Sequence, residues 1–211
     1  MPARPSVVDL VKDNPTYFGA RKSPRVERLR AATFLAIDGS GSPSGESFPQ
    51  AIGALYGVAY TLKFALKEAG RPTFKVAPLE GLWWLGRTPT KAPDFDIFHT
   101  TDPNAWRWRL LVMIPKGINA AKVAATGRAL TKAKGESTFS KVRLQRLNEK
   151  RVVQLLHVGP YGRERPSLAA LHGFAAEQGL SLRGPHHEIY LNNPQRTAPA
   201  KLRTILRYPV R

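Results

Sequence analysis

The spacing of apolar residues predicts one long helix and several strands. The clearest helical stripe recurs at steps of three and four positions and consists of Phe48, Ile52, Leu55, Ala59, Leu62 and Leu66. Ser47 is a suitable N-cap for this helix, and Gly70 stands where a left-handed stop is expected. Alternation of apolar and polar residues predicts strands from Trp106 to Ile114 and from Leu202 to Tyr208.

The same order of signals occurs twice along the chain: an apolar run, a turn, a helix, a glycine and a strand that carries an acid. The first copy consists of residues 34–37, 38–41, a helix from about Ser47, Gly70 and a strand with Glu80. The second consists of residues 152–158, 159–162, a helix from about Pro166, Gly179 and a strand with Glu188. This order predicts a duplicated strand–helix–strand–strand module, with two equivalent glutamates about a pseudo-twofold axis.

The predicted fold is therefore of the α+β class. We expect one antiparallel sheet with helices on one side, a second sheet face left available, and a ligand cleft between the halves. The chain is treated as one domain, 1–211, with pseudo-repeats at about 26–114 and 119–209 and an N-terminal arm at 1–24. Within the first repeat, Val26 to Ile37 is expected to form one strand that is buried in its latter part.

Glu188 is the leading candidate for chemistry. In a strand, His186, Glu188 and Tyr190 share one face, and Ile189 lies on the other. An acid between two rings in mid-strand indicates either a solvated or ion-paired sheet face, or a glutamate that lines a cleft. The strand with Glu80 follows the same order of signals as the strand with Glu188, which favours the cleft. Both glutamates are candidate catalytic residues.

Aromatic residues are dense around these acids, with Trp83 and Trp84 beside Glu80. Such a cup suits a flat, cationic or hydrogen-bond-donating organic molecule, because ring stacking, cation–π attraction and charge pairing act together. The same residues could instead pack against one another in the hydrophobic core. A ligand site and a core cluster therefore both stay open as interpretations. The candidate ligand-binding residues are Tyr56, Tyr60, Trp83, Trp84, Trp106, Trp108, His157, Tyr161, His186 and Tyr190.

Several kinds of site are not indicated by the sequence. Gly39-Ser40-Gly41 lacks the downstream glycine and lysine of a phosphate loop, and no Gly-x-Ser-x-Gly elbow occurs. His186 and His187 are adjacent in a strand and point to opposite faces, so both cannot easily reach one metal ion. We therefore expect no metal site and no cofactor.

Composition narrows the class of protein further. No stretch is apolar for about 18 residues, which excludes a membrane span, and the lack of cysteine suits a cytoplasmic location. The net charge is +18, from 33 Lys and Arg against 15 Asp and Glu. Because these cations are scattered over three regions, nucleic-acid binding is expected to be weak and salt-dependent.

The chain resembles the GyrI-like small-molecule-binding proteins, in particular their stand-alone bacterial branch. The resemblance rests on Phe34-Leu35-Ala36-Ile37-Asp38-Gly39, Ala54-Leu55-Tyr56-Gly57-Val58-Ala59-Tyr60, Pro78-Leu79-Glu80-Gly81-Leu82-Trp83-Trp84, Gln154-Leu155-Leu156-His157-Val158-Gly159-Pro160-Tyr161, His186-His187-Glu188-Ile189-Tyr190-Leu191 and Lys201-Leu202-Arg203-Thr204-Ile205-Leu206-Arg207. It implies the duplicated fold, Glu188 as the ligand glutamate, and cleft aromatics at Tyr56, Trp84, Trp106 or Trp108, and Tyr190.

The resemblance also implies two kinds of activity. Some stand-alone members hydrolyse cyclopropane-bearing, DNA-alkylating compounds, and relatives fused to regulators only bind cationic drugs. We therefore expect a binder of planar, cationic or electrophilic organic molecules, with hydrolysis left open. The alternative is a nucleic-acid- or gyrase-interacting protein that uses its basic surface. The sequence leaves the oligomeric state open.

Overall fold

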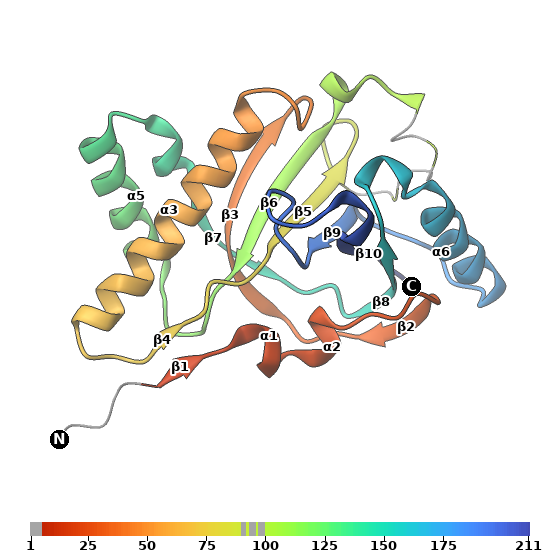
Figure 1. Cartoon of the computed structure of the whole chain (residues 1–211), viewed down its shortest axis with the longest axis horizontal. Helices are drawn as coiled ribbons and strands as arrows, with labels where there is room; N and C mark the ends of the chain where they lie inside the picture. The colour runs from red at the N-terminus through yellow and green to blue at the C-terminus, as the bar shows by residue number, and fades with distance from the viewer. Residues whose placement is uncertain (1–5, 90–91, 93–95, 97–99) are drawn as a thin grey trace.

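A single large antiparallel sheet forms the centre of the computed structural model, which describes residues 6–89, 92, 96 and 100–211 (Figure 1). The order of its eight strands is β2-β8-β10-β9-β5-β6-β3-β7. The strands are β2 (Arg25–Arg28), β3 (Ala32–Ser40), β5 (Leu79–Trp84), β6 (Arg107–Met113), β7 (Arg143–Leu147), β8 (Arg151–Val158), β9 (His186–Tyr190) and β10 (Arg203–Pro209). The long helices are α3 (Ser47–Glu68), α5 (Ala120–Lys134) and α6 (Arg165–Glu177).

The strand order confirms the predicted duplication. Strands β3, β6 and β5 follow one another on one side of the middle, and β8, β10 and β9 mirror them on the other side. Each outer strand is followed in the chain by a long helix, α3 after β3 and α6 after β8. The halves meet where β5 pairs with β9, so the pseudo-twofold axis passes between these two strands.

The expected single strand from Val26 to Ile37 is wrong. The chain forms β2, leaves the sheet at residues 29–31 and re-enters it as β3. Strand β2 pairs with β8 of the second half, whereas β7, from later in the chain, pairs with β3 of the first half. The two edge strands are therefore exchanged between the halves, which ties the halves together beyond the β5–β9 seam.

The three long helices pack on one face of the sheet. Residues of the predicted stripe, including Leu55, Ala59 and Leu62, are buried against Leu35 and Ile37 of β3. Helix α6 covers the other half through a core of its own, which includes Leu168, Leu171 and Ala175. In Figure 1, α3 and α5 lie over the β3–β6 half of the sheet and α6 over the β8–β10 half.

The opposite face of the sheet is not left available, which corrects the expectation of a free face. The N-terminal segment crosses it as β1 (Val7–Val8), α1 (Leu10–Asp13) and α2 (Pro15–Phe18). Tyr17 and Phe18 are buried there against residues from both halves, among them Phe34 and Ile205. Residues 8–18 are thus an integral part of the fold, because they close a core that the sheet alone would leave in water.

Within the described residues, no helix combines the length and the apolar character needed to cross a membrane.

Candidate functional site

A deep cleft opens on the helix-covered face, between α3 and the start of α6 and above the β5–β9 seam. Its volume is about 1080 Å³, enough for an organic molecule of several rings. Helix α3 supplies one wall, through Phe48, Ile52, Tyr56 and Tyr60. The floor consists of residues of β5 and β9, and residues 192–195 and part of the N-terminal segment form the rim.

The aromatic side chains of the cleft are held by one another. Phe48 stacks on Trp83 with ring centroids 5.5 Å apart, and Trp106 meets Trp83 edge to face at 5.9 Å. The indole Nε1 of Trp83 donates a hydrogen bond of 3.2 Å to the hydroxyl of Tyr190. Tyr161 meets Tyr190 edge to face at 5.5 Å. These contacts fix the ring planes before any ligand arrives.

Gly81 creates the room for this arrangement. A Cβ atom at this position would lie 2.7 Å from Nε1 of Trp83 and 3.1 Å from the hydroxyl of Tyr190. Gly81 is paired with Glu188 across the β5–β9 seam. Trp83 and Tyr190 can therefore form their hydrogen bond above the β5–β9 pair only because residue 81 has no side chain.

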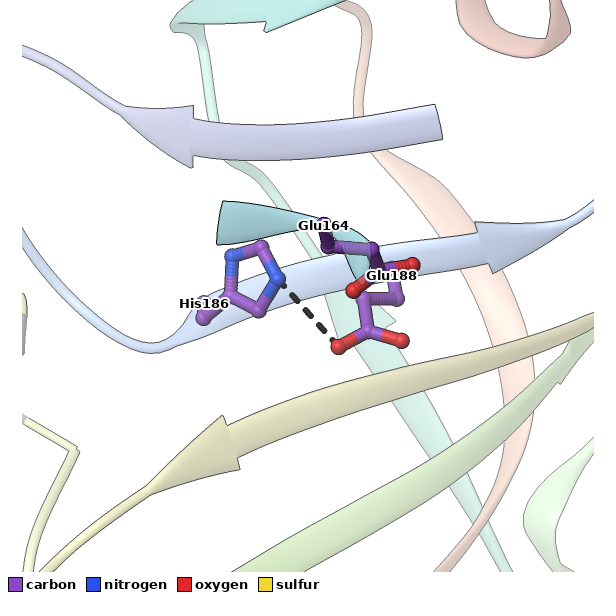
Figure 2. A group of neighbouring side chains, drawn as sticks. All are labelled: Glu164, His186 and Glu188. Carbon is purple, nitrogen blue, oxygen red and sulfur yellow. Dashed lines mark ion pairs between the residues drawn. The ribbon is translucent and has the colours of Figure 1, made fainter. Parts of the chain in front are cut away.

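Two carboxyl groups and an imidazole gather at one end of the cleft (Figure 2). Glu188 and His186 come from β9, and Glu164 from the residue just before α6. One polar atom from each of the three lies within 4.8 Å of the other two. Nε2 of His186 is 3.2 Å from Oε1 of Glu188. Glu164 is 6% exposed, and its Oε1 has no hydrogen-bond partner among the described residues.

The cluster changes the acidity of its members. Burial, together with the nearby Glu188 carboxylate, raises the pKa of Glu164 well above its ordinary value. Burial and the same carboxylate raise the pKa of Tyr190 well above the usual value for a phenol. Glu164 therefore keeps its proton to a higher pH than an ordinary glutamate, and it does so beside the Glu188 carboxylate, which is the arrangement of a proton donor next to an acceptor.

Comparison with known proteins identifies the family of this chain. The chain matches the GyrI-like small molecule binding domain over residues 22–211. It belongs to the GyrI-like family. A conserved protein of uncharacterized role from Listeria innocua is 32% identical, with a TM-score of 0.86 over 97% of this chain and 100% of that chain. A hydrolase from Listeria innocua is 30% identical, with a TM-score of 0.82 and the same coverage.

More distant likeness extends to the fold alone. The C-terminal domain of EcmrR is 12% identical, with a TM-score of 0.53 over 90% of this chain and 97% of that domain. No curated protein matches the chain.

The structure brings most of the sequence-predicted site residues of this GyrI-like chain together. Those that line the cleft are Glu188, Tyr56, Tyr60, Trp83, Trp106, Tyr161, His186 and Tyr190. Residues far apart in the sequence thus converge on one cavity. Their roles toward a ligand remain predictions, since position alone does not assign a role.

Four other predicted site residues do not line the cleft. Trp108 is on the same sheet face but is buried beneath Phe48, and its ring occupies the space over Gly39. His157 is on the cleft face of the sheet, on β8, but outside the cleft lining, and its Nδ1 is 3.0 Å from the hydroxyl of Ser167. Trp84 and Glu80 are on the opposite face of the sheet, in or beside the core closed by the N-terminal segment.

Glu80 and Glu188 occupy equivalent strands but opposite faces, which corrects the expectation of two equivalent acids in one cleft. Strand register pairs Glu80 with Ile189 and Gly81 with Glu188, and cross-strand partners share a face. The cleft-side equivalent of Glu188 is therefore Gly81. Only one of the two predicted acids reaches the cavity.

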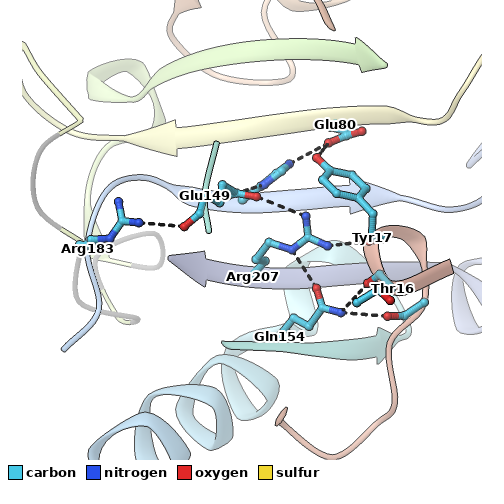
Figure 3. A network of polar contacts seen from close by, with 9 residues as sticks. Thr16, Tyr17, Glu80, Glu149, Gln154, Arg183 and Arg207 are labelled. Carbon is cyan, nitrogen blue, oxygen red and sulfur yellow. Dashed lines mark hydrogen bonds and ion pairs between the residues drawn. The ribbon is translucent and has the colours of Figure 1, made fainter. Parts of the chain in front are cut away.

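Glu80 belongs instead to a buried network of charges (Figure 3). His187 lies between two acids, with Nε2 2.9 Å from Glu80 and Nδ1 2.9 Å from Glu149. Although burial disfavours the charged imidazole, these two carboxylates raise the pKa of His187 to about 9. Arg207 lies 3.3 Å from the second oxygen of Glu149. Two cations thus neutralise two anions in the buried interior.

The same network fastens the N-terminal segment to the sheet. The hydroxyl of Tyr17 donates a 2.6 Å hydrogen bond to Glu80. Arg207 donates to the backbone oxygen of Tyr17 at 2.6 Å and lies 4.4 Å from the centre of its ring. Gln154 donates to the backbone oxygens of Thr16 and Gly19. The role of Glu80 in these contacts is structural.

Sequence reasoning missed Glu164 and Phe48 as cleft residues. Phe48 was assigned to the core stripe of α3, and it serves both the core and the cleft. Glu164 comes directly before Arg165 and Pro166, where the helix was expected to start, so an acid near a helix N-terminus was the available signal. Nothing in the sequence showed that this helix end would point at Glu188.

Proposed function

We propose that this protein binds flat organic molecules that carry a positive charge or an electrophilic centre, with the rings between the cleft aromatics and the charged part near Glu188. The observation that carries the proposal is the combination of an aromatic cavity of about 1080 Å³ with a largely buried carboxylate at one end. Membership of a small-molecule-binding family supports it. A cation over aromatic faces and beside a carboxylate gains from both contacts.

We further propose that the cleft hydrolyses strained electrophiles, such as a cyclopropane conjugated to a carbonyl group. Two relatives at 30% and 31% identity are hydrolases, which supports this activity. Glu188 would accept a proton from water as the water oxygen bonds to a ring carbon. The electrons of the breaking carbon–carbon bond would move to the carbonyl oxygen, which would take a proton from Glu164. The net change is the addition of one water.

Binding is tested with 10-methylacridinium, a flat cation, by fluorescence titration. Glu188→Gln keeps the shape of the side chain and removes its charge, so the affinity should fall about tenfold to hundredfold, corresponding to about 1.5–3 kcal/mol. Glu177→Gln, an exposed site on α6, makes the same change in net charge and should leave the affinity unchanged. Equal affinity of wild type and Glu188→Gln would refute the assignment of Glu188.

Hydrolysis is tested separately, with a carbonyl-conjugated cyclopropane and isotopically labelled water. Wild type should add one labelled oxygen to the product, and Glu188→Gln should not turn over although it retains the aromatic walls. If wild type binds the compound without adding water, the protein is a binder and the hydrolytic part of the proposal is wrong.

A further inference from the structure

The cleft contains two carboxyl groups close together, rather than a single carboxylate facing the ligand. Glu164 and Glu188 come from separate parts of the fold and present oxygens within 4.8 Å of each other. Glu164 is nearly fully buried, and Glu188 is 14% exposed in its side chain. Two negative charges at this separation in a largely buried site repel each other strongly, so the pair favours holding one proton when the cleft is empty.

Oxygen Oε1 of Glu164 has no hydrogen-bond partner among the described residues. A buried oxygen without a partner leaves the ionised form of Glu164 poorly solvated, which favours the protonated form in the empty cleft. Glu164 lines the cavity beside Glu188, so the positive charge of a guest that binds there acts on both carboxyl groups.

We propose that the cleft exchanges a proton for an organic cation, with the Glu164–Glu188 pair as the exchanging group. The inference rests on the proposed binding function and specifies its ligand class as monovalent organic cations. When the cation enters, its charge replaces that of the proton held on Glu164, Glu164 ionises, and the proton leaves to solvent. An uncharged molecule of the same shape contacts the same aromatic side chains but displaces no proton.

Other polar groups that can carry a proton lie near the pair. On β9 itself these are His186 and Tyr190, and from the elements packed against it they are Tyr161 and His157, both of which feel the charge of Glu188. Across the cleft, Asp9 and Lys75 form an ion pair of 2.8 Å at the rim. That pair is already neutral. Among the described residues, His186 and the hydroxyl of Tyr190 both contact Glu188, so the test must separate them from Glu164.

The experiment compares 10-methylacridinium with its uncharged isostere 9-methylanthracene between pH 5.5 and 8.5. Release of one proton on binding makes the affinity rise by up to about tenfold per pH unit until Glu164 is ionised in the empty cleft. We expect this rise for the cation and less than about a twofold change for the isostere. In calorimetry, the binding enthalpy of the cation should vary with the ionisation enthalpy of the buffer, which reports the released proton directly.

Glu164→Gln should abolish both the pH dependence and the proton release while the cation still binds. The control is Asp9→Asn, which also removes a carboxylate from the cleft lining, but one whose pKa is lowered by its hydrogen bond to Lys75. It should retain the pH dependence, whatever its effect on affinity. Persistent proton release in Glu164→Gln would assign the proton to another group beside Glu188 and overturn the proposal.

Two further outcomes would also overturn it. Equal pH dependence of the cation and the isostere would show that charge is not exchanged. Tight binding of Zn²⁺ or Mn²⁺ alone, lost in Glu164→Gln, would make Glu164, His186 and Glu188 a metal site instead. Failure of methylacridinium to bind at any pH would count against the proposed function itself, whereas binding without pH dependence would count only against the exchange.

Discussion

Glu80→Gln separates the structural role of this residue from the catalytic role that its sequence context suggested. The substitution keeps the size of the side chain and removes one of the two charges that face His187. We expect the variant to be clearly less stable than wild type and to bind methylacridinium with unchanged affinity, because Glu80 lies across the sheet from the cleft.

The magnitude follows from the network. A pKa of about 9 for His187, against 6.5 for a free imidazole, corresponds to about 3 kcal/mol in favour of the charged form. Glu149 and Glu80 share this effect, and the loss of charge also weakens the hydrogen bond from Tyr17. Together these losses amount to about 2–3 kcal/mol. For a chain of this length, that lowers Tm by about 4–12 °C.

The sign of the pH dependence provides a second readout. Because folding raises the pKa of His187, the stabilisation is complete below pH 6.5 and is lost as the pH rises through about 9. Wild type should therefore lose stability between pH 6 and 9.5 in urea denaturation followed by tryptophan fluorescence. Glu80→Gln should lose less over the same interval, because less stabilisation is present at the start.

Glu177→Gln is again the matched control and should behave as wild type at each pH. A Glu80→Gln protein that is as stable as wild type but has lost ligand binding would refute the structural assignment. That result would instead support a role of Glu80 in ligand binding.

Three other substitutions test the cleft and the N-terminal segment. Gly81→Ala should separate Trp83 from Tyr190 and weaken methylacridinium binding severalfold with a native circular-dichroism spectrum; unchanged affinity would show that this hydrogen bond is dispensable. Glu164→Gln should raise stability by about 1–3 kcal/mol at pH 7.5, because a buried acid with a raised pKa loses stability as the pH rises above its unfolded value; a less stable variant would contradict this. Tyr17→Phe should cost about 1.5–3 kcal/mol in urea denaturation, and an unaffected midpoint would mean that its bond to Glu80 contributes nothing.

Much of the fold was predictable because periodicity reports local structure. The stripe from Phe48 to Leu66 lies in α3, and the glycines expected to stop the two main helices, Gly70 and Gly179, have φ angles of 64° and 63°. The duplication was visible because each half repeats the same order of signals. What periodicity could not supply was the break after Arg28, since residues on both sides of it have strand character.

The faces of the two glutamates could not be predicted from their motifs. Glu80 is the second residue of β5 and Glu188 the third residue of β9, so a match of the motifs differs by one position from a match of the strands. A shift of one residue moves a side chain to the other face of a sheet. The approach of Glu164 to Glu188 is likewise a tertiary contact between distant segments, for which local sequence carries no signal.

Strand β9 has a consequence for how such a protein can diversify. Alternate residues of this one strand serve two environments: His186, Glu188 and Tyr190 face the cleft, whereas His187 faces the interlocked charges on the other side. A substitution of Glu188 can alter which compounds are accepted without touching the charge network around His187. The ligand preference of the cleft can thus change at this position at low cost in stability, provided that His187 on the other face stays as it is.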